Sequence, residues 1–150
     1  MDPMQGVFRG LDIAAGGLSA EMLRAEVVAA NIANMNITRG ADGQPYRRRG
    51  VVFEEVLADV GGPDRGGPDR GIGGVRVADT FQDFETPFVP RFMPGHPHAD
   101  ERGWVMTSNV DLFREMVDMM AIVRSYQSNL AAMRSYRGMI RNTITHIGRS

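Results

Sequence analysis

The sequence predicts a mainly α-helical protein, in which long N- and C-terminal helices form an α-helical coiled coil with a small β-rich insertion between them. Three observations lead to this prediction. A series of apolar residues spaced three and four apart, which we call a ladder, occurs near the N-terminus, and a second occurs near the C-terminus. The segment between them is rich in glycine and proline. A hydrophobic period close to 3.5 residues, held over many turns, is typical of helices that wind around partner helices.

The C-terminal ladder alternates steps of four and three residues, and its one polar member is Arg137. We expect its helix to begin near Ser108 or Asn109, either of which can cap a first turn, and to run to Ile147. The full ladder is Leu112, Met116, Met119, Val123, Tyr126, Leu130, Met133, Arg137, Ile140, Ile144 and Ile147. A helix of this length must bury its ladder, against the N-terminal ladder or against a neighbouring chain.

The N-terminal ladder has the same spacing, and its one polar member is Glu21. Asp2 and Pro3 give the helix a cap and a first residue, and it should run to about Met35. We expect the asparagine-rich stretch 31–36 to end it, because Asn tolerates the left-handed conformation of a helix stop. The ladder is Met4, Val7, Leu11, Ala14, Leu18, Glu21, Ala25, Val28, Ile32 and Met35.

The domain organisation that follows is a discontinuous terminal-helix domain, 1–39 and 108–150, interrupted by a β/loop insertion, 40–107. Short strand signals occur at 51–53 and 75–77, with weaker ones at 88–89 and 104–106. Between the first two lies a tandem Gly-Gly-Pro-Asp-Arg repeat, which predicts a mobile glycine-rich loop over 59–74.

Composition excludes several classes of protein. The chain has no cysteine, so thiolate metal sites, thiol nucleophiles and disulfides are absent, and its net charge of −1 gives no general attraction to nucleic acid. Residues 1–35 sum to −2 and residues 109–150 to +3. This difference favours pairing of the two ends, although arginines near a helix C-terminus also complement the helix dipole. We expect no membrane-spanning segment and no cleavable secretory signal.

Two stretches suggest chemistry. His96, His98 and Asp100 have a spacing that can seed a metal site, which leaves a metal-dependent hydrolase as the alternative function, but the surrounding prolines and glycines favour a surface turn. The basic run 47–49 permits nucleic-acid binding, and a charged strand edge is the commoner explanation. No other residue set has a catalytic spacing.

Three blocks together resemble one family. Residues 11–13, 17–20 and 30–38 are similar to the N-terminal signature of bacterial flagellar rod, hook and hook-associated proteins. Residues 45–53, 74–77, 94–110 and 115–119 narrow the resemblance to the proximal rod proteins of the FlgC type. Asp111, Trp104 and the Gly-Gly-Pro-Asp-Arg repeat depart from the family pattern, and none of them lies on a ladder.

The resemblance implies a structural subunit, not an enzyme, without cofactor or metal. Such a subunit is exported from the cytoplasm by the flagellar type III system without a cleaved signal peptide. It joins the basal-body rod in the periplasmic space, which transmits torque from motor to hook. The implied partners are FlgB, FlgF, FlgG, FliE, copies of itself and the export apparatus, with no nucleic acid and no direct membrane insertion. A cytoplasmic coiled-coil adaptor is the remaining rival.

The predicted functional residues are therefore packing residues. We expect the helix-packing and assembly interface to contain Val7, Leu11, Leu18, Ile32, Met116, Met119, Val123, Tyr126, Leu130, Met133 and Ile140. We expect Asn31, Asn34 and Asn36 to hold the junction between the first helix and the insertion.

Overall fold

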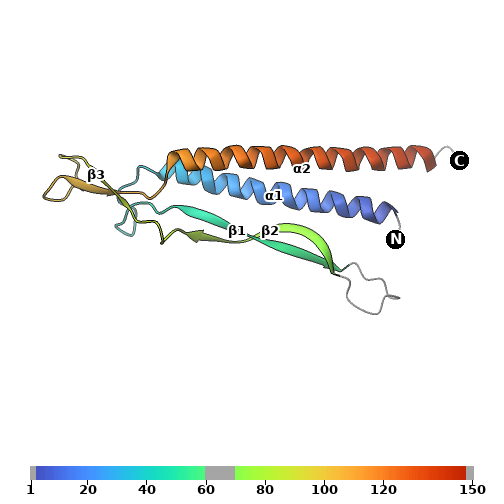
Figure 1. Cartoon of the computed structure of the whole chain (residues 1–150), viewed down its shortest axis with the longest axis horizontal. Helices are drawn as coiled ribbons and strands as arrows, with labels where there is room; N and C mark the ends of the chain where they lie inside the picture. Colours follow the sequence, from blue (N-terminus) through green and yellow to red (C-terminus); the bar gives the residue numbers. More distant parts are fainter. Residues whose placement is uncertain (1–2, 60–69, 148–150) are drawn as a thin grey trace. The chain divides into compact units, whose positions relative to one another are not determined.

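The computed structural model describes residues 3–59 and 70–147, with side chains described over 6–57 and 73–145. Along the chain, one helix comes first, two small antiparallel sheets follow, and a second helix comes last (Figure 1). The elements are α1 (Pro3–Asn34), β1 (Arg49–Asp59), β2 (Arg70–Gln82), β3 (Val89–Phe92), β4 (Trp104–Thr107) and α2 (Leu112–Ile147). The predicted class, mainly α with a β insertion, is confirmed.

Helix α1 runs unbroken for 32 residues and passes through Gly16 and Gly17 without a stop. It ends at Asn34, as the sequence predicts to within a residue, but the predicted left-handed asparagine is wrong. Glycines alone have a positive φ among the described residues. The chain instead leaves the helix by a turn in which the Ile37 amide donates to the Asn34 carbonyl at 3.0 Å.

Helix α2 begins later than predicted. Its cap is Asp111, whose Oδ1 accepts from the amides of Phe113 at 2.9 Å and Arg114 at 3.3 Å. The predicted cap Asn109 is committed elsewhere, because its amide donates to the carbonyls of Asp83 and Thr86. A side chain that ties two segments together is not free to cap a helix, so the helix starts at Leu112.

Strands β1 and β2 pair with each other and are far longer than the predicted runs, with 11 and 13 residues. Pairing satisfies backbone groups whatever the side chains, so the ribbon continues through polar positions such as Glu54 that a hydrophobic pattern does not mark. Strands β3 and β4 form a second antiparallel pair, with Phe92 opposite Trp104 and Val89 opposite Thr107. The mobile loop predicted over 59–74 differs from the structure at its ends, because residue 59 belongs to β1 and residues 70–74 belong to β2. The rest of that loop, 60–69, lies outside the described residues.

The chain divides into two compact units, the first built from three segments and the second from two. The first contains 1–23, 53–78 and 122–150, and the second contains 24–52 and 79–121. The predicted division into a terminal-helix domain and an insertion stays a prediction.

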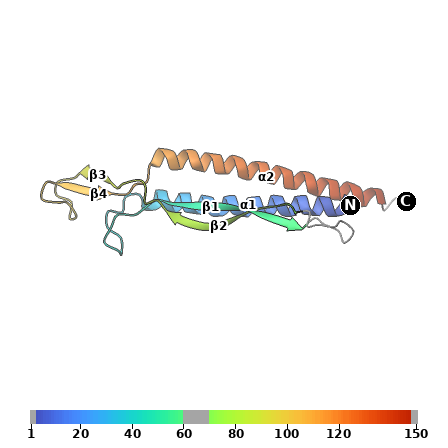
Figure 2. The ribbon, with the colours of Figure 1, turned by 60° about the horizontal axis from the view of Figure 1, so that its bottom comes forward.

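In the first unit, α1 and α2 lie side by side, and β1 and β2 lie along α1 (Figures 1 and 2). The contact with α2 uses glycines. A Cβ added to Gly10 would stand 2.4 Å from Cζ of Tyr136, and one added to Gly17 would stand 2.8 Å from Nδ2 of Asn129. On the β side, a Cβ added to Gly16 would stand 3.3 Å from the Val75 carbonyl oxygen. Small residues thus let α2 and β2 approach two sides of α1.

The second unit buries few apolar side chains, chiefly Val28 and Val105. Much of its buried volume is polar, with Asn31, Thr107, Ser108, Asn109 and Glu115 all enclosed. Because a buried polar group is costly without partners, this cluster identifies the part of the chain in which side-chain chemistry decides the structure.

Candidate functional site

Glu115 lies at the centre of the second unit, in the first turn of α2, and its side chain has 0% exposure. Both carboxylate oxygens are occupied. Oε1 accepts from Nε of Arg48 at 2.6 Å, and Oε2 accepts from Nδ2 of Asn31 at 3.0 Å. A buried carboxylate is tolerated where a cation and hydrogen bonds compensate its lost hydration, and Glu115 has both.

Asn31 completes this cluster from α1, also with 0% exposure. Its Nδ2 donates to the Arg49 carbonyl at 2.8 Å, and its Oδ1 accepts from the Arg49 amide at 2.9 Å and from the Tyr46 hydroxyl at 3.1 Å. The Asn31 side chain therefore makes the two backbone hydrogen bonds with Arg49, the first residue of β1, that a neighbouring strand would otherwise make. We name the set Asn31, Tyr46, Arg48, Asn109, Glu115 and Asp118 the polar junction.

Arg48 connects the polar junction to a second carboxylate. Its Nη2 lies 3.3 Å from Oδ2 of Asp118, and Arg24 reaches the same carboxylate at 3.6 Å. The Arg48 amide donates to Oδ1 of Asn109 at 2.7 Å. The end of α1, the start of β1 and the start of α2 are therefore held together by charge-assisted bonds, which are stronger than neutral ones.

The other two arginines of the basic run have aromatic partners. The Arg47 guanidinium lies 4.7 Å from the ring centre of Phe84 and 4.1 Å from that of Phe88, and its Nη1 donates to the Asp83 carbonyl at 2.8 Å. The Arg49 guanidinium lies 5.9 Å from the ring centre of Tyr46. These cation–π contacts give Arg47 and Arg49 partners within the chain, so the basic run 47–49 is explained without a nucleic-acid ligand.

Two groups near the polar junction have displaced pKa values. Burial raises the pKa of Tyr46, with the positive charge of Arg49 partly opposing and the negative charge of Glu115 adding to the rise. Hydrogen bonds from the amide and then the hydroxyl of Thr86 lower the pKa of Asp83. Asp83 thus favours its charged form, in which it holds the turn before β3.

The stretch from His96 to Asp100 forms turns. The Nδ1 of His98 lies 2.9 Å from the Thr38 hydroxyl, and the Nδ1 of His96 accepts from the His98 amide at 3.1 Å. Oδ1 of Asp100 accepts from the amides of Arg102 and Trp104. No group of three acidic or histidine side chains able to hold a metal ion occurs within the described part of the chain.

The predicted packing residues divide into two groups. Those on α1 and several on α2 are half-buried within the chain: Val7, Leu11, Leu18, Ile32, Met119, Leu130, Met133 and Ile140. Met116, Val123 and Tyr126 are 46%, 47% and 40% exposed. The side of α2 that the chain covers includes Glu115, Ile122, Asn129 and Tyr136, seven residues apart, each adjacent in sequence to a ladder position. The ladder is thus only partly covered, and its role as an interface stays a prediction.

The three predicted junction asparagines have different environments. Asn31 bridges α1 and β1, whereas Nδ2 of Asn34 donates to the Ala30 carbonyl of its own helix at 2.7 Å, and Asn36 is exposed. Sequence reasoning did not identify Arg48 and Glu115 as partners. The sequence signal for Glu115 is weak, because it is a charged residue beside a ladder position and the same face of α2 also contains the polar Asn129.

Family models match both ends of the chain. Residues 11–41 match the model described as "Flagella basal body rod protein", and residues 101–145 match "Flagellar basal body rod FlgEFG protein C-terminal". These ranges include Asn31 and Glu115 of the polar junction. Over the described helices, no stretch is long and apolar enough to cross a membrane.

Whole-chain relatives agree with these models. The chain is 39% identical over 134 residues to a flagellar basal-body rod protein FlgC of Escherichia coli O6:H1, covering 89% of this chain and 92% of that one. It is 37% identical over 147 residues to the FlgC of Borreliella burgdorferi, with 93% and 96% covered. It is 33% identical over 140 residues to that of Bacillus subtilis, with 89% and 93% covered. The chain therefore belongs to the FlgC family of flagellar basal-body rod proteins, the structural subunits of the flagellar rod.

Proposed function

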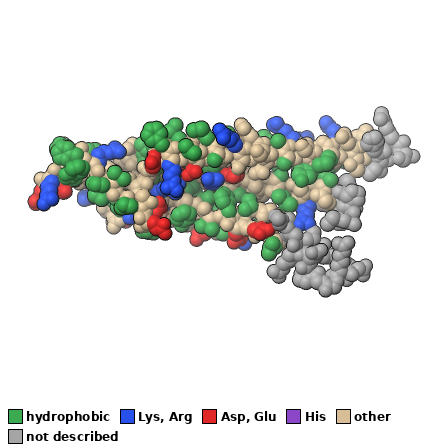
Figure 3. All heavy atoms as spheres, viewed as in Figure 1, with side chains coloured by type: hydrophobic (Ala, Val, Ile, Leu, Met, Phe, Trp, Pro, Cys, Tyr) green, Lys and Arg blue, Asp and Glu red, His purple; other side chains and the backbone are tan. Residues whose placement is uncertain are grey.

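We propose that this chain is a non-catalytic subunit of the proximal rod, and that it assembles through its terminal helices after export by the flagellar type III system. The observation that carries the proposal is the exposed part of the C-terminal ladder. Met116, Val123 and Tyr126 follow one side of α2, and they are 46%, 47% and 40% exposed. The space-filling view shows hydrophobic side chains at the surface over this helix (Figure 3).

The free energy gained by removing these three side chains from water supports the binding of a neighbouring subunit there. Each of the three side chains is nearly half exposed, which for residues of this size is roughly 100 Å² of accessible area. At about 25 cal/mol per Å², covering each contributes roughly 2 kcal/mol. A continuous apolar stripe on a helix is the surface that neighbouring helices cover in a coiled coil.

The proposed partners are copies of the chain and the other rod subunits FlgB, FlgF, FlgG and FliE. The C-terminal ladder is apolar except for Arg137, and apolar contacts impose little direction, so it can pack against slightly different neighbours. Three of its members are methionines, whose flexible side chains suit such repacking. In this arrangement the helices carry torque along the rod, and the protein needs no cofactor.

The proposal is tested with Val123→Asp, which places a charge on the exposed stripe. We expect the purified variant to unfold at the same urea concentration as the unchanged chain, because Val123 is not part of the core. Cells making it should secrete the subunit but lack rods, hooks and swimming. Ser128→Asp, exposed on α2 but outside the ladder, is the matched control and should swim. Normal swimming by the Val123→Asp strain would contradict the proposal.

A further inference from the structure

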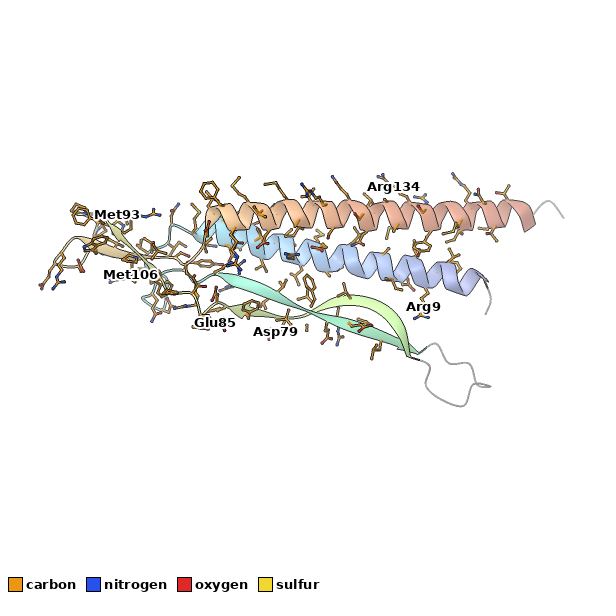
Figure 4. The ribbon with its side chains drawn as sticks, in the orientation of Figure 1. Arg9, Asp79, Glu85, Met93, Met106 and Arg134 are labelled. Atoms are coloured by element: carbon orange, nitrogen blue, oxygen red, sulfur yellow. The ribbon has the colours of Figure 1, made fainter. Side chains whose placement is uncertain are left out.

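The β3–β4 hairpin has one apolar face without a cover. Residues opposite each other in an antiparallel pair point to the same face. Phe92 lies opposite Trp104, and Pro90 lies opposite Met106. All four are exposed, whereas Val105, on the other face, is 1% exposed. We name Pro90, Phe92, Trp104 and Met106 the hairpin face; Met106 is labelled in Figure 4.

Two aromatic rings organise this surface. Phe92 and Trp104 meet edge to face, with ring centres 5.4 Å apart and planes at 63°. Because each ring holds the other, both are positioned before any partner arrives. Tryptophan, phenylalanine and methionine are also enriched at the cores of protein interfaces. The hairpin face is therefore better suited to contact a protein than to remain in water.

The same unit has a second uncovered apolar surface, on α2. Phe113, Val117 and Met120 follow steps of four and three residues, so they share one side of the helix, and Phe113 is 80% exposed. They do not belong to the assembly ladder and lie about a quarter turn away from it. We name them the second stripe. The assembly ladder thus leaves two apolar surfaces of this unit unexplained.

Each of the two surfaces has beside it an exposed residue whose charge is opposite to one beside the other. Glu101 lies at the tip of the hairpin, and Arg114 lies next to Val117 on the turn of α2 before it; both are exposed. Within the described residues, neither side chain has an ion-pair partner. The neighbouring Asp118 is already held by Arg48 and Arg24. Glu101 of one copy can therefore pair with Arg114 of the next, although the exposed Arg102 lies beside Glu101.

We propose that, in the rod, the hairpin face of one copy docks on the second stripe of the next copy. The inference rests on the proposed function, since it names a contact between subunits of that assembly. Each copy then gives one surface and receives another, which is a heterologous contact of the kind that builds open helical arrays.

The size of the contact fits such an array. Seven side chains of roughly 100 Å² each bury roughly 700 Å², below the roughly 1,200–2,000 Å² of a stable pair. The contact is therefore too small to hold a dimer in dilute solution, and it adds to the ladder contacts only where many copies are assembled. A subunit that must travel as a monomer benefits from this weakness.

The absence of cysteine allows a direct test by site-specific disulfides. One strain makes two variants together, Trp104→Cys and Val117→Cys, and its purified basal bodies are treated with a mild oxidant. We expect a band at twice the subunit mass that contains one copy of each variant. The same oxidant should give no such band when Val117→Cys is replaced by the exposed Gln127→Cys.

The outcomes separate this contact from the rod assignment. A band from two Trp104→Cys copies, a cross-link to a subunit of another mass, or no band in basal bodies that contain both variants overturns the docking and leaves the rod assignment intact. Absence of even the Gln127→Cys control from basal bodies would instead contradict the proposed function. Met106→Cys with Met120→Cys provides an independent pair, should the first reduce assembly.

Discussion

The Arg48 guanidinium donates to the Glu115 carboxylate at 2.6 Å, and the Glu115 side chain has no exposed surface. The pair joins the start of β1 to the start of α2. Because the Asn31 amide occupies the other carboxylate oxygen, the end of α1 is joined to the same point. Three segments distant in sequence thus share one buried charge.

Glu115→Ala should be strongly destabilising. It leaves Arg48 largely buried, with only the more distant Asp118 as an ionic partner, and removing one member of a buried pair typically costs about 3–5 kcal/mol. Urea unfolding followed by circular dichroism measures the loss. The double variant Arg48→Met with Glu115→Leu should recover much of it, because a well-packed apolar pair of similar size replaces the charges. Unchanged stability of Glu115→Ala would show that Asp118 alone satisfies Arg48.

Asn31→Ala should cost more than Asn34→Ala, although both asparagines belong to the same stretch. Asn31 bonds to the backbone of Arg49, to Tyr46 and to Glu115, and the variant leaves several buried groups unpaired, at roughly 1–3 kcal/mol each. Asn34 bonds only to its own helix, so its loss should cost about 1 kcal/mol or less. Equal unfolding midpoints for the two variants would exclude the bridging role of Asn31.

The sequence predicts the helices well and the polar junction poorly, for a physical reason. A hydrophobic period of 3.5 residues is a local signal, so α1 and α2 could be placed to within a few residues. The start of α2 was missed because Asn109, a good cap by type, bonds to the distant carbonyls of Asp83 and Thr86. Tertiary contacts of this kind leave no periodic trace.

The ladder itself shows the same limit. Its spacing marks one side of α2, yet the side covered within the chain contains Glu115, Asn129 and Tyr136, and is displaced by one residue. Periodicity identifies an apolar surface but not which partner covers it. The predicted interface and the coiled coil are therefore tested by the assembly of the Val123→Asp variant.

Gly10→Ala should destabilise the chain, although alanine favours helices. The new methyl group would stand 2.4 Å from Cζ of Tyr136, so α1 and α2 would have to separate or the ring would have to move. Overpacking of this kind typically costs about 1–3 kcal/mol. Gly6→Ala is the control, since a Cβ there meets nothing within 4 Å, and it should stabilise by about 0.5–1 kcal/mol. Thermal unfolding gives both values, and a stabilising Gly10→Ala would show that the Tyr136 ring does not pack tightly against α1 there.

The chain should lose stability in alkaline solution through Tyr46. Burial raises the pKa of its hydroxyl above the ordinary value of 10.0, so the unfolded chain releases this proton at a lower pH than the folded chain. The contribution to stability is full below the unfolded pKa and is lost as pH rises through the folded one.

Tyr46→Phe has no proton to lose, so its free energy of unfolding should decline less between about pH 9 and 11. At neutral pH it should be lower by about 1 kcal/mol, because the hydroxyl no longer donates to Asn31. Tyr126→Phe, which changes an exposed tyrosine, should keep the full alkaline decline. If both variants follow the unchanged chain across this range, Tyr46 does not couple its ionisation to folding.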